Sequence, residues 1–80
     1  MVAVHLWSSL TRFTDGAREV DIDAQTVGGV LDGLKSDYPG LEPILDAGVS
    51  VVIDGEIATG RHVEIPEGAE VVLMQRLKGG

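Results

Sequence analysis

Apolar and polar positions alternate at the start of the chain, from Val2 to Trp7. A period of two is typical of a β-strand, whose successive side chains point to opposite faces. Trp7 should therefore face away from the core. A second alternating stretch, residues 18–23, sets Val20 and Ile22 between charged side chains. We expect the two stretches to pair as antiparallel strands, the second with one face in water.

The connection between these stretches, residues 8–16, is largely polar and ends in the turn signal Asp15-Gly16. We expect an irregular loop here. Leu10 and Phe13 would be small apolar anchors beneath it.

A helical period follows the second strand. Thr26 is a plausible N-cap, and apolar side chains then recur on one face of a helix, at Val27, Val30, Leu31, Leu34 and Tyr38. Gly28, Gly29 and Gly33 weaken this helix, because each costs about 1 kcal/mol relative to alanine in a helix interior. Packing on the sheet must therefore hold the helix, and the small residues would let it approach closely. Pro39-Gly40 ends it.

The second half of the chain returns to strand patterns. Residues 41–45 predict a short helical turn, and the apolar run 49–53 predicts a strand. Asp54-Gly55 is a strong hairpin signal, so residues 56–58 should pair back on that strand. Residues 60–65 have no clear period. The turn 66–68 leads into a last strand at about residues 70–76.

These elements predict an α+β fold, in which one main helix packs on one face of a mixed sheet of about four to five strands. The opposite face would have no second layer. Alternation then predicts an exposed apolar patch on that face, formed by Trp7, Val52, Val72 and Met74. Such patches commonly bind partner proteins. The alternative is that some of these side chains close a second small cluster.

Composition narrows the possible functions. A chain of 80 residues is long enough for one small domain, which we place at 1–80 with an exposed tail at 76–80. The net charge of −7 argues against nucleic acid as a partner. The sequence has no cysteine, which excludes disulfides, a cysteine-ligated metal and a thiol nucleophile of its own. No membrane-spanning run or leader is apparent, so we expect a cytoplasmic protein without a membrane partner.

The sequence gives little support for an enzyme with its own catalytic groups. Ser8 and Ser9 lack the context of a nucleophile elbow, and Gly28-Gly29 does not form a phosphate-binding fingerprint. His5 and His62 lack the spacing of known zinc motifs, so we predict no metal site.

The last five residues carry the most distinctive chemistry. Arg76, Leu77 and Lys78 follow the apolar run of the last strand and precede Gly79-Gly80. Two residues without side chains form a thin peptide that can enter a narrow channel. One interpretation is a carboxylate presented to the active site of another enzyme. The others are a frayed end and glycines that stand at this position by chance.

Several motifs in order resemble one family. They are Thr26-Val27-Gly28 opening the helix, Asp37-Tyr38-Pro39-Gly40-Leu41 ending it, Ile53-Asp54-Gly55-Glu56, Pro66-Glu67-Gly68-Ala69-Glu70-Val71 and the final Gly79-Gly80. Together they resemble the MoaD/ThiS family of ubiquitin-like β-grasp sulfur carriers, over essentially the whole chain. One departure is Arg76-Leu77-Lys78, where the family often has a proline-containing stretch. This ending is closer to the basic, leucine-bearing tail of ubiquitin.

The resemblance implies a carrier without catalytic groups or bound cofactors of its own. An E1-like adenylating enzyme of the MoeB/ThiF type would use ATP to adenylate the Gly80 carboxylate. A sulfur donor would then convert it to a thiocarboxylate. Arg76, Leu77, Lys78 and Gly79 would enter the partner's active site.

A downstream synthase, in molybdopterin or thiamine biosynthesis for example, would accept the sulfur. Two alternatives stay open. The chain could be a ubiquitin-like modifier joined to lysines through Gly80, or a β-grasp interaction module. The sequence also leaves open whether Gly80 is the native terminus or is exposed by processing.

Overall fold

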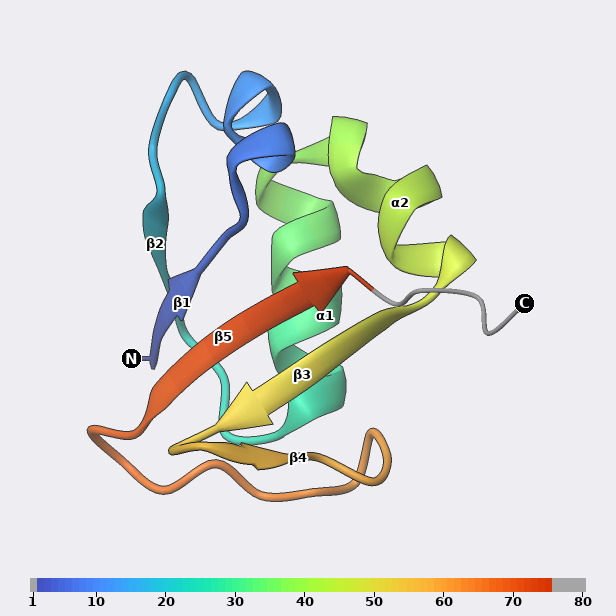
Figure 1. The fold of residues 1–80 in the computed structure, drawn as a ribbon. Helices are drawn as coiled ribbons and strands as arrows, with labels where there is room; N and C mark the ends of the chain where they lie inside the picture. Colours follow the sequence, from blue (N-terminus) through green and yellow to red (C-terminus); the bar gives the residue numbers. More distant parts are fainter. Residues whose placement is uncertain (1, 76–80) are drawn as a thin grey trace.

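The computed structural model of the protein describes residues 2–75. Its elements, in chain order, are β1 (Val2–His5), η1 (Ser8–Phe13), β2 (Glu19–Ile22), α1 (Val27–Asp37), η2 (Pro39–Leu41), α2 (Glu42–Ala47), β3 (Val49–Ile53), β4 (Glu56–Ile57) and β5 (Glu70–Gln75). Figure 1 shows the two α-helices on one side of the sheet and no described helix or strand on the other side. In the described part of the chain, no helix is both long and apolar enough to cross a membrane.

The sheet has five strands in the order β2-β1-β5-β3-β4. The central pair, β1 and β5, is parallel, while the other three neighbouring pairs are antiparallel. The predicted mixed sheet and the predicted pairing of the first two strands are therefore confirmed. Because β5 lies between β1 and β3, the last described strand is held on both sides, and it ends at Gln75.

The core lies between the sheet and α1. The inward side chains of the two central strands include Val4, Val71 and Leu73, and all three are buried almost completely. From α1, Val30 and Leu34 pack against them. The helical period and the strand alternation thus select the residues that form the core.

Gly33 shows how closely α1 approaches the sheet. A Cβ atom at this position would lie 2.6 Å from Cγ2 of Ile22 on β2, which is shorter than a van der Waals contact. Any side chain larger than hydrogen would therefore push the helix away from the strand. The expectation that small residues let the helix approach closely is confirmed here.

The segment 8–16 differs from the predicted irregular loop. Residues Ser8–Phe13 form a 3-10 helix, in which Leu10 is buried. The ring of Phe13 covers Gly40, where an added Cβ would lie 2.7 Å from Cδ1 of the ring. The sequence does not predict this element, because a short 3-10 helix needs only one or two apolar anchors. It is too short to show a hydrophobic period.

The predicted hairpin at Asp54-Gly55 is confirmed. Both residues have positive φ angles, 48° and 88°, as the two central positions of a type I′ turn require. The carboxylate of Asp54 accepts a hydrogen bond of 2.9 Å from the backbone N–H of Glu70. The turn is thereby tied to the first residue of β5.

Candidate functional site

In Figure 1, no described helix or strand covers the face of the sheet opposite α1, which is called the outer face below. Strand pairing joins one row of residues across all five strands: Ile57, Val52, Val72, His5 and Glu19. Met74 lies on the same face of β5, two residues beyond Val72, and pairs with Ser50. The outer face is therefore apolar along this row on β4, β3 and β5, and polar on β1 and β2.

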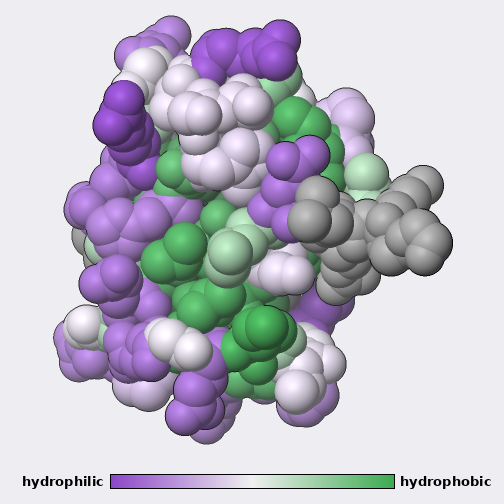
Figure 2. Space-filling model, in the orientation of Figure 1, coloured by the Kyte–Doolittle hydropathy of each residue, from purple (hydrophilic) through white to green (hydrophobic). Residues whose placement is uncertain are grey.

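The apolar part of this face is called the outer patch and consists of Val52, Ile57, Val72 and Met74. Ile57 is 69% exposed and Met74 is 52% exposed, while Val52 and Val72 are half-buried. Figure 2 shows apolar side chains gathered over this part of the sheet. The structure therefore places Val52, Val72 and Met74 together, as alternation predicts. Their role in binding a partner stays a prediction.

The structure removes Trp7 from the predicted patch and adds Ile57. Trp7 is half-buried and packs against the main core, and in the described part of the chain no strand pairing joins it to the outer patch. Ile57 is not in the predicted patch, but the structure places it there. The tight turn at Asp54-Gly55 pairs Ile57 with Val52, so the hairpin signal itself would have placed Ile57 on the outer face.

The other predicted site residues, Arg76, Leu77, Lys78, Gly79 and Gly80, lie outside the described residues. The structure does fix where they are attached. β5 ends at Gln75, which pairs with Val49 and directly follows Met74 of the outer patch. Five residues of extended chain span at most about 18 Å. A partner that holds Gly80 must therefore also lie near the outer patch.

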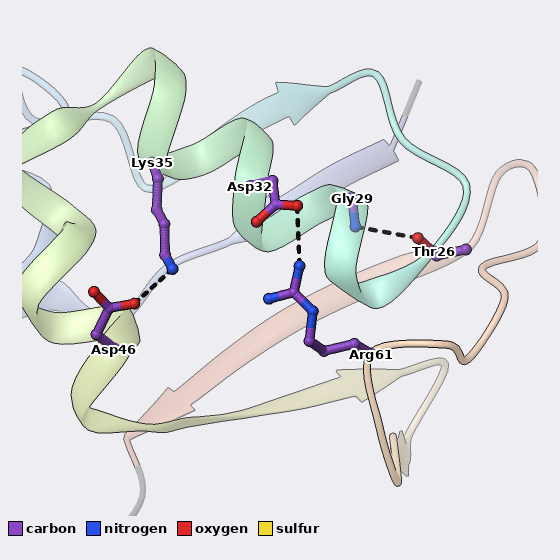
Figure 3. A network of polar contacts seen from close by, with 6 residues as sticks. All are labelled: Thr26, Gly29, Asp32, Lys35, Asp46 and Arg61. Atoms are coloured by element: carbon purple, nitrogen blue, oxygen red, sulfur yellow. Dashed lines mark hydrogen bonds and ion pairs between the residues drawn. The ribbon is translucent and has the colours of Figure 1, made fainter.

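The start of α1 offers no open phosphate cradle. The backbone N–H of Val27 donates to the carbonyl of Val63 at 3.0 Å, and that of Gly28 donates to the carbonyl of Arg61 at 2.9 Å. The N–H of Gly29 donates to Oγ1 of Thr26 at 3.1 Å, which confirms Thr26 as the N-cap (Figure 3). The first donors of the helix, where an anion would bind, already have partners.

Two ion pairs fasten other segments to α1 on the helix side of the molecule. Arg61 pairs with Asp32 at 2.9 Å, and Lys35 pairs with Asp46 of α2 (Figure 3). Three of the four side chains are more than half exposed and that of Lys35 is 25% exposed, so we expect both pairs to fasten the loop and α2 only weakly. Among residues 2–75, no group of three His, Asp or Glu side chains is arranged to hold a metal ion.

A mixed sheet with the strand order β2-β1-β5-β3-β4 and one long helix across it is the ubiquitin-like β-grasp fold. This defines the class of protein. The chain belongs to the ThiS family, whose family model matches residues 4–80. Comparison with curated proteins finds no match.

Solved structures agree with this assignment. A chain of the Amycolatopsis orientalis BexX/CysO complex has a TM-score of 0.85 at 21% identity, with both chains covered completely. Mycobacterium tuberculosis CysO has a TM-score of 0.82 at 22% identity, over 96% of this chain and 100% of that one. These two show the fold. SAMP1 from Haloferax volcanii is 30% identical over 99% of this chain and 98% of its own, with a TM-score of 0.73.

Proposed function

We propose that the protein is a sulfur carrier whose Gly80 carboxylate is adenylated by an E1-like enzyme and then converted to a thiocarboxylate. The observation that carries this proposal is the ThiS family match, which extends through Gly79-Gly80 to residue 80. The position of the outer patch at the root of these residues supports it. On this proposal, the catalytic groups belong to the partner enzymes.

A free carboxylate is a poor acyl donor, so the proposed chemistry begins with activation of the Gly80 carboxylate. The Gly80 carboxylate oxygen attacks the α-phosphorus of ATP, and pyrophosphate leaves. The resulting acyl-adenylate has AMP as a good leaving group. Hydrosulfide (HS⁻) released by the sulfur donor attacks the acyl carbon and expels AMP, which carries away one carboxylate oxygen. Sulfur then takes the place of that oxygen. The thiocarboxylate sulfur is then the nucleophile for a downstream synthase.

The contribution of this chain is to present and position its end. Glycine at positions 79 and 80 has no side chain to obstruct the channel that leads to the bound nucleotide. The outer patch would anchor the folded part on the enzyme, so that the reacting carboxylate is held near ATP. Exposed apolar side chains such as Ile57 and Met74 are the kind that such anchors use.

The test is reconstitution with the E1-like enzyme of the source organism, ATP and a sulfur source. We expect pyrophosphate release that depends on this protein, and an intact mass increased by the difference between sulfur and oxygen. Gly80→Ala should abolish both, because its side chain blocks the channel, while the variant folds as the wild type does. Release that continues undiminished with Gly80→Ala would contradict the proposal.

Protein conjugation is the second candidate, and two observations favour it. A solved structure of Haloferax volcanii small archaeal modifier protein 1 is 29% identical over 95% of this chain. Arg76-Leu77-Lys78 also resembles the end of ubiquitin. In this role the activated Gly80 would form an amide with lysines of other proteins. Gly-Gly-branched lysines in the host proteome that disappear when the gene is deleted would establish it.

A third candidate, an interaction module whose glycines have no role, predicts the opposite result for Gly80. Binding of its partner would be the same for the wild type, for Gly80→Ala and for a chain extended by one residue. The first two candidates require the extended chain to be inactive, because Gly80 would no longer carry the free carboxylate.

A further inference from the structure

The polar part of the outer face has charges of one sign. Glu19 and Asp21 on β2 and Glu70 on β5 are exposed, and alternation directs all three to the outer face. We call these three residues the acidic rim. The pairing register places Ala3 between Asp21 and Glu70, so only a methyl group separates the two carboxylate positions.

The acidic rim is contiguous with the outer patch. Glu70 and Val72 are two residues apart on the same face of β5, and His5 connects Val72 to Glu19 by register. The Nδ1 atom of His5 lies 3.5 Å from Oε1 of Glu19, and both side chains are partly exposed. A partner that covers the outer patch therefore also reaches the carboxylates of the rim.

Positive side chains in the described part of the chain lie elsewhere. Lys35 and Arg61 are ion-paired on the helix side, and Arg12 belongs to η1. Arg18 is exposed at the bend directly before β2 and belongs to no strand. Among residues 2–75, the strands therefore present no Lys or Arg on the outer face to neutralise the rim.

We propose that the docking partner has an apolar centre for the outer patch and Lys or Arg side chains that meet the acidic rim. This inference rests on the proposed function and specifies the chemistry of the partner surface. A partner with acidic residues at these positions would bring like charges together, which costs affinity and slows association. Complementary rim charges act chiefly by steering association, so their effect depends on salt.

The sequence also has basic residues after β5, and this opposite charge would help to orient the partner. Arg76 and Lys78 are basic and follow β5, whereas Glu70 at the start of β5 is acidic. The partner would therefore have basic residues facing the acidic rim, and acidic groups or nucleotide phosphates near residues 76–80. Opposite charges at the start of β5 and after it would favour one orientation of the partner on the outer face.

The experiment compares two double variants with the same change in charge. Glu19→Lys/Glu70→Lys reverses two of the three rim carboxylates, and Asp37→Lys/Glu42→Lys reverses two exposed carboxylates on the helix side. Each full-length protein is titrated into the E1-like adenylating enzyme without ATP, by calorimetry at low and high NaCl. Circular dichroism and thermal unfolding first confirm that all variants are folded.

We expect the rim variant to bind about tenfold or more weakly at low salt, and the difference to shrink at high salt because the charges are screened. The helix-side variant should stay within about twofold of the wild type. Equal affinities for the two variants, or tighter binding of the rim variant, would overturn the inference.

Pyrophosphate release by the wild type distinguishes a failure of the proposed function from a failure of the inferred charge complementarity. If the wild type is adenylated and the rim reversal has no effect, the proposed function stands and this inference fails. If the wild type binds but is not adenylated, the proposed function fails and the ratio of dissociation constants still decides the charge claim. If the wild type neither binds nor is adenylated, both fail.

Discussion

The inner and outer faces of the sheet are formed by the same strands but have different roles. On β5, Leu73 is 1% exposed and its neighbour Met74 is 52% exposed. The inner face is covered by α1 and forms the core, while the outer face combines exposed apolar and acidic side chains. Substitutions on the inner face should therefore affect stability, and those on the outer face should affect binding.

The largest expected effect is on the inner face. Leu73→Ala should lower the free energy of unfolding by about 3 kcal/mol, because it removes buried methyl groups and leaves a cavity. Met74→Ala, one residue along the same strand, should change it by about 0.5 kcal/mol or less. Urea unfolding of both variants measures the difference. Equal losses would show that the outer face also contributes to the core.

The contact between α1 and β2 provides a second test of the inner face. Gly33→Ala should destabilise the protein by about 1–2 kcal/mol, because the clash with the buried Ile22 outweighs the gain in helix propensity. Thermal and urea unfolding measure this change. Gly33→Ala/Ile22→Ala, which removes the clashing Cγ2 atom of Ile22, should lose less stability than the sum of the two single variants. A stabilised Gly33→Ala variant would contradict the close packing seen here.

On the outer face, Ile57→Asp should leave stability nearly unchanged and weaken binding of the adenylating enzyme about tenfold, which corresponds to about 1.4 kcal/mol. The aspartate places a charge in the apolar centre of the interface. Thr59→Asp is the matched control, since Thr59 is exposed and outside the outer patch. Equal binding by the two variants would remove Ile57 from the docking surface.

The smallest effect should come from the ion pair between Arg61 and Asp32. Both side chains are more than half exposed, so Arg61→Ala should cost about 0.5 kcal/mol or less. A double-mutant cycle with Asp32→Ala isolates the pair. A coupling energy several times larger would show that this pair, and not the backbone bonds of the 61–63 segment, holds the loop on α1.

Much of the fold follows from local patterns in the sequence. Alternation identifies β1, β2 and β5, the N-cap and apolar period identify α1, and Asp54-Gly55 identifies the hairpin. The 3-10 helix at Ser8–Phe13 does not follow, because its stability depends on contacts such as that between Phe13 and Gly40, which are distant in sequence.

The candidate site was only partly predictable for the same reason. Alternation alone places Val72 and Met74 on the outer face. The acidic rim requires the parallel register of β1 with β5, which brings Glu70 beside Ala3 from opposite ends of the chain. No local pattern contains that register. Alternation predicts Trp7 in the patch because the alternating pattern continues through it, whereas in the structure the chain enters η1 directly after Trp7.

The most direct test of the central claim is the intact mass of this protein isolated from its native host. We predict a fraction heavier by one exchange of oxygen for sulfur, localised by fragmentation to the carboxyl group of Gly80. Unmodified carboxylate throughout, in cells that express both the adenylating enzyme and a sulfur donor, would contradict the sulfur-carrier function.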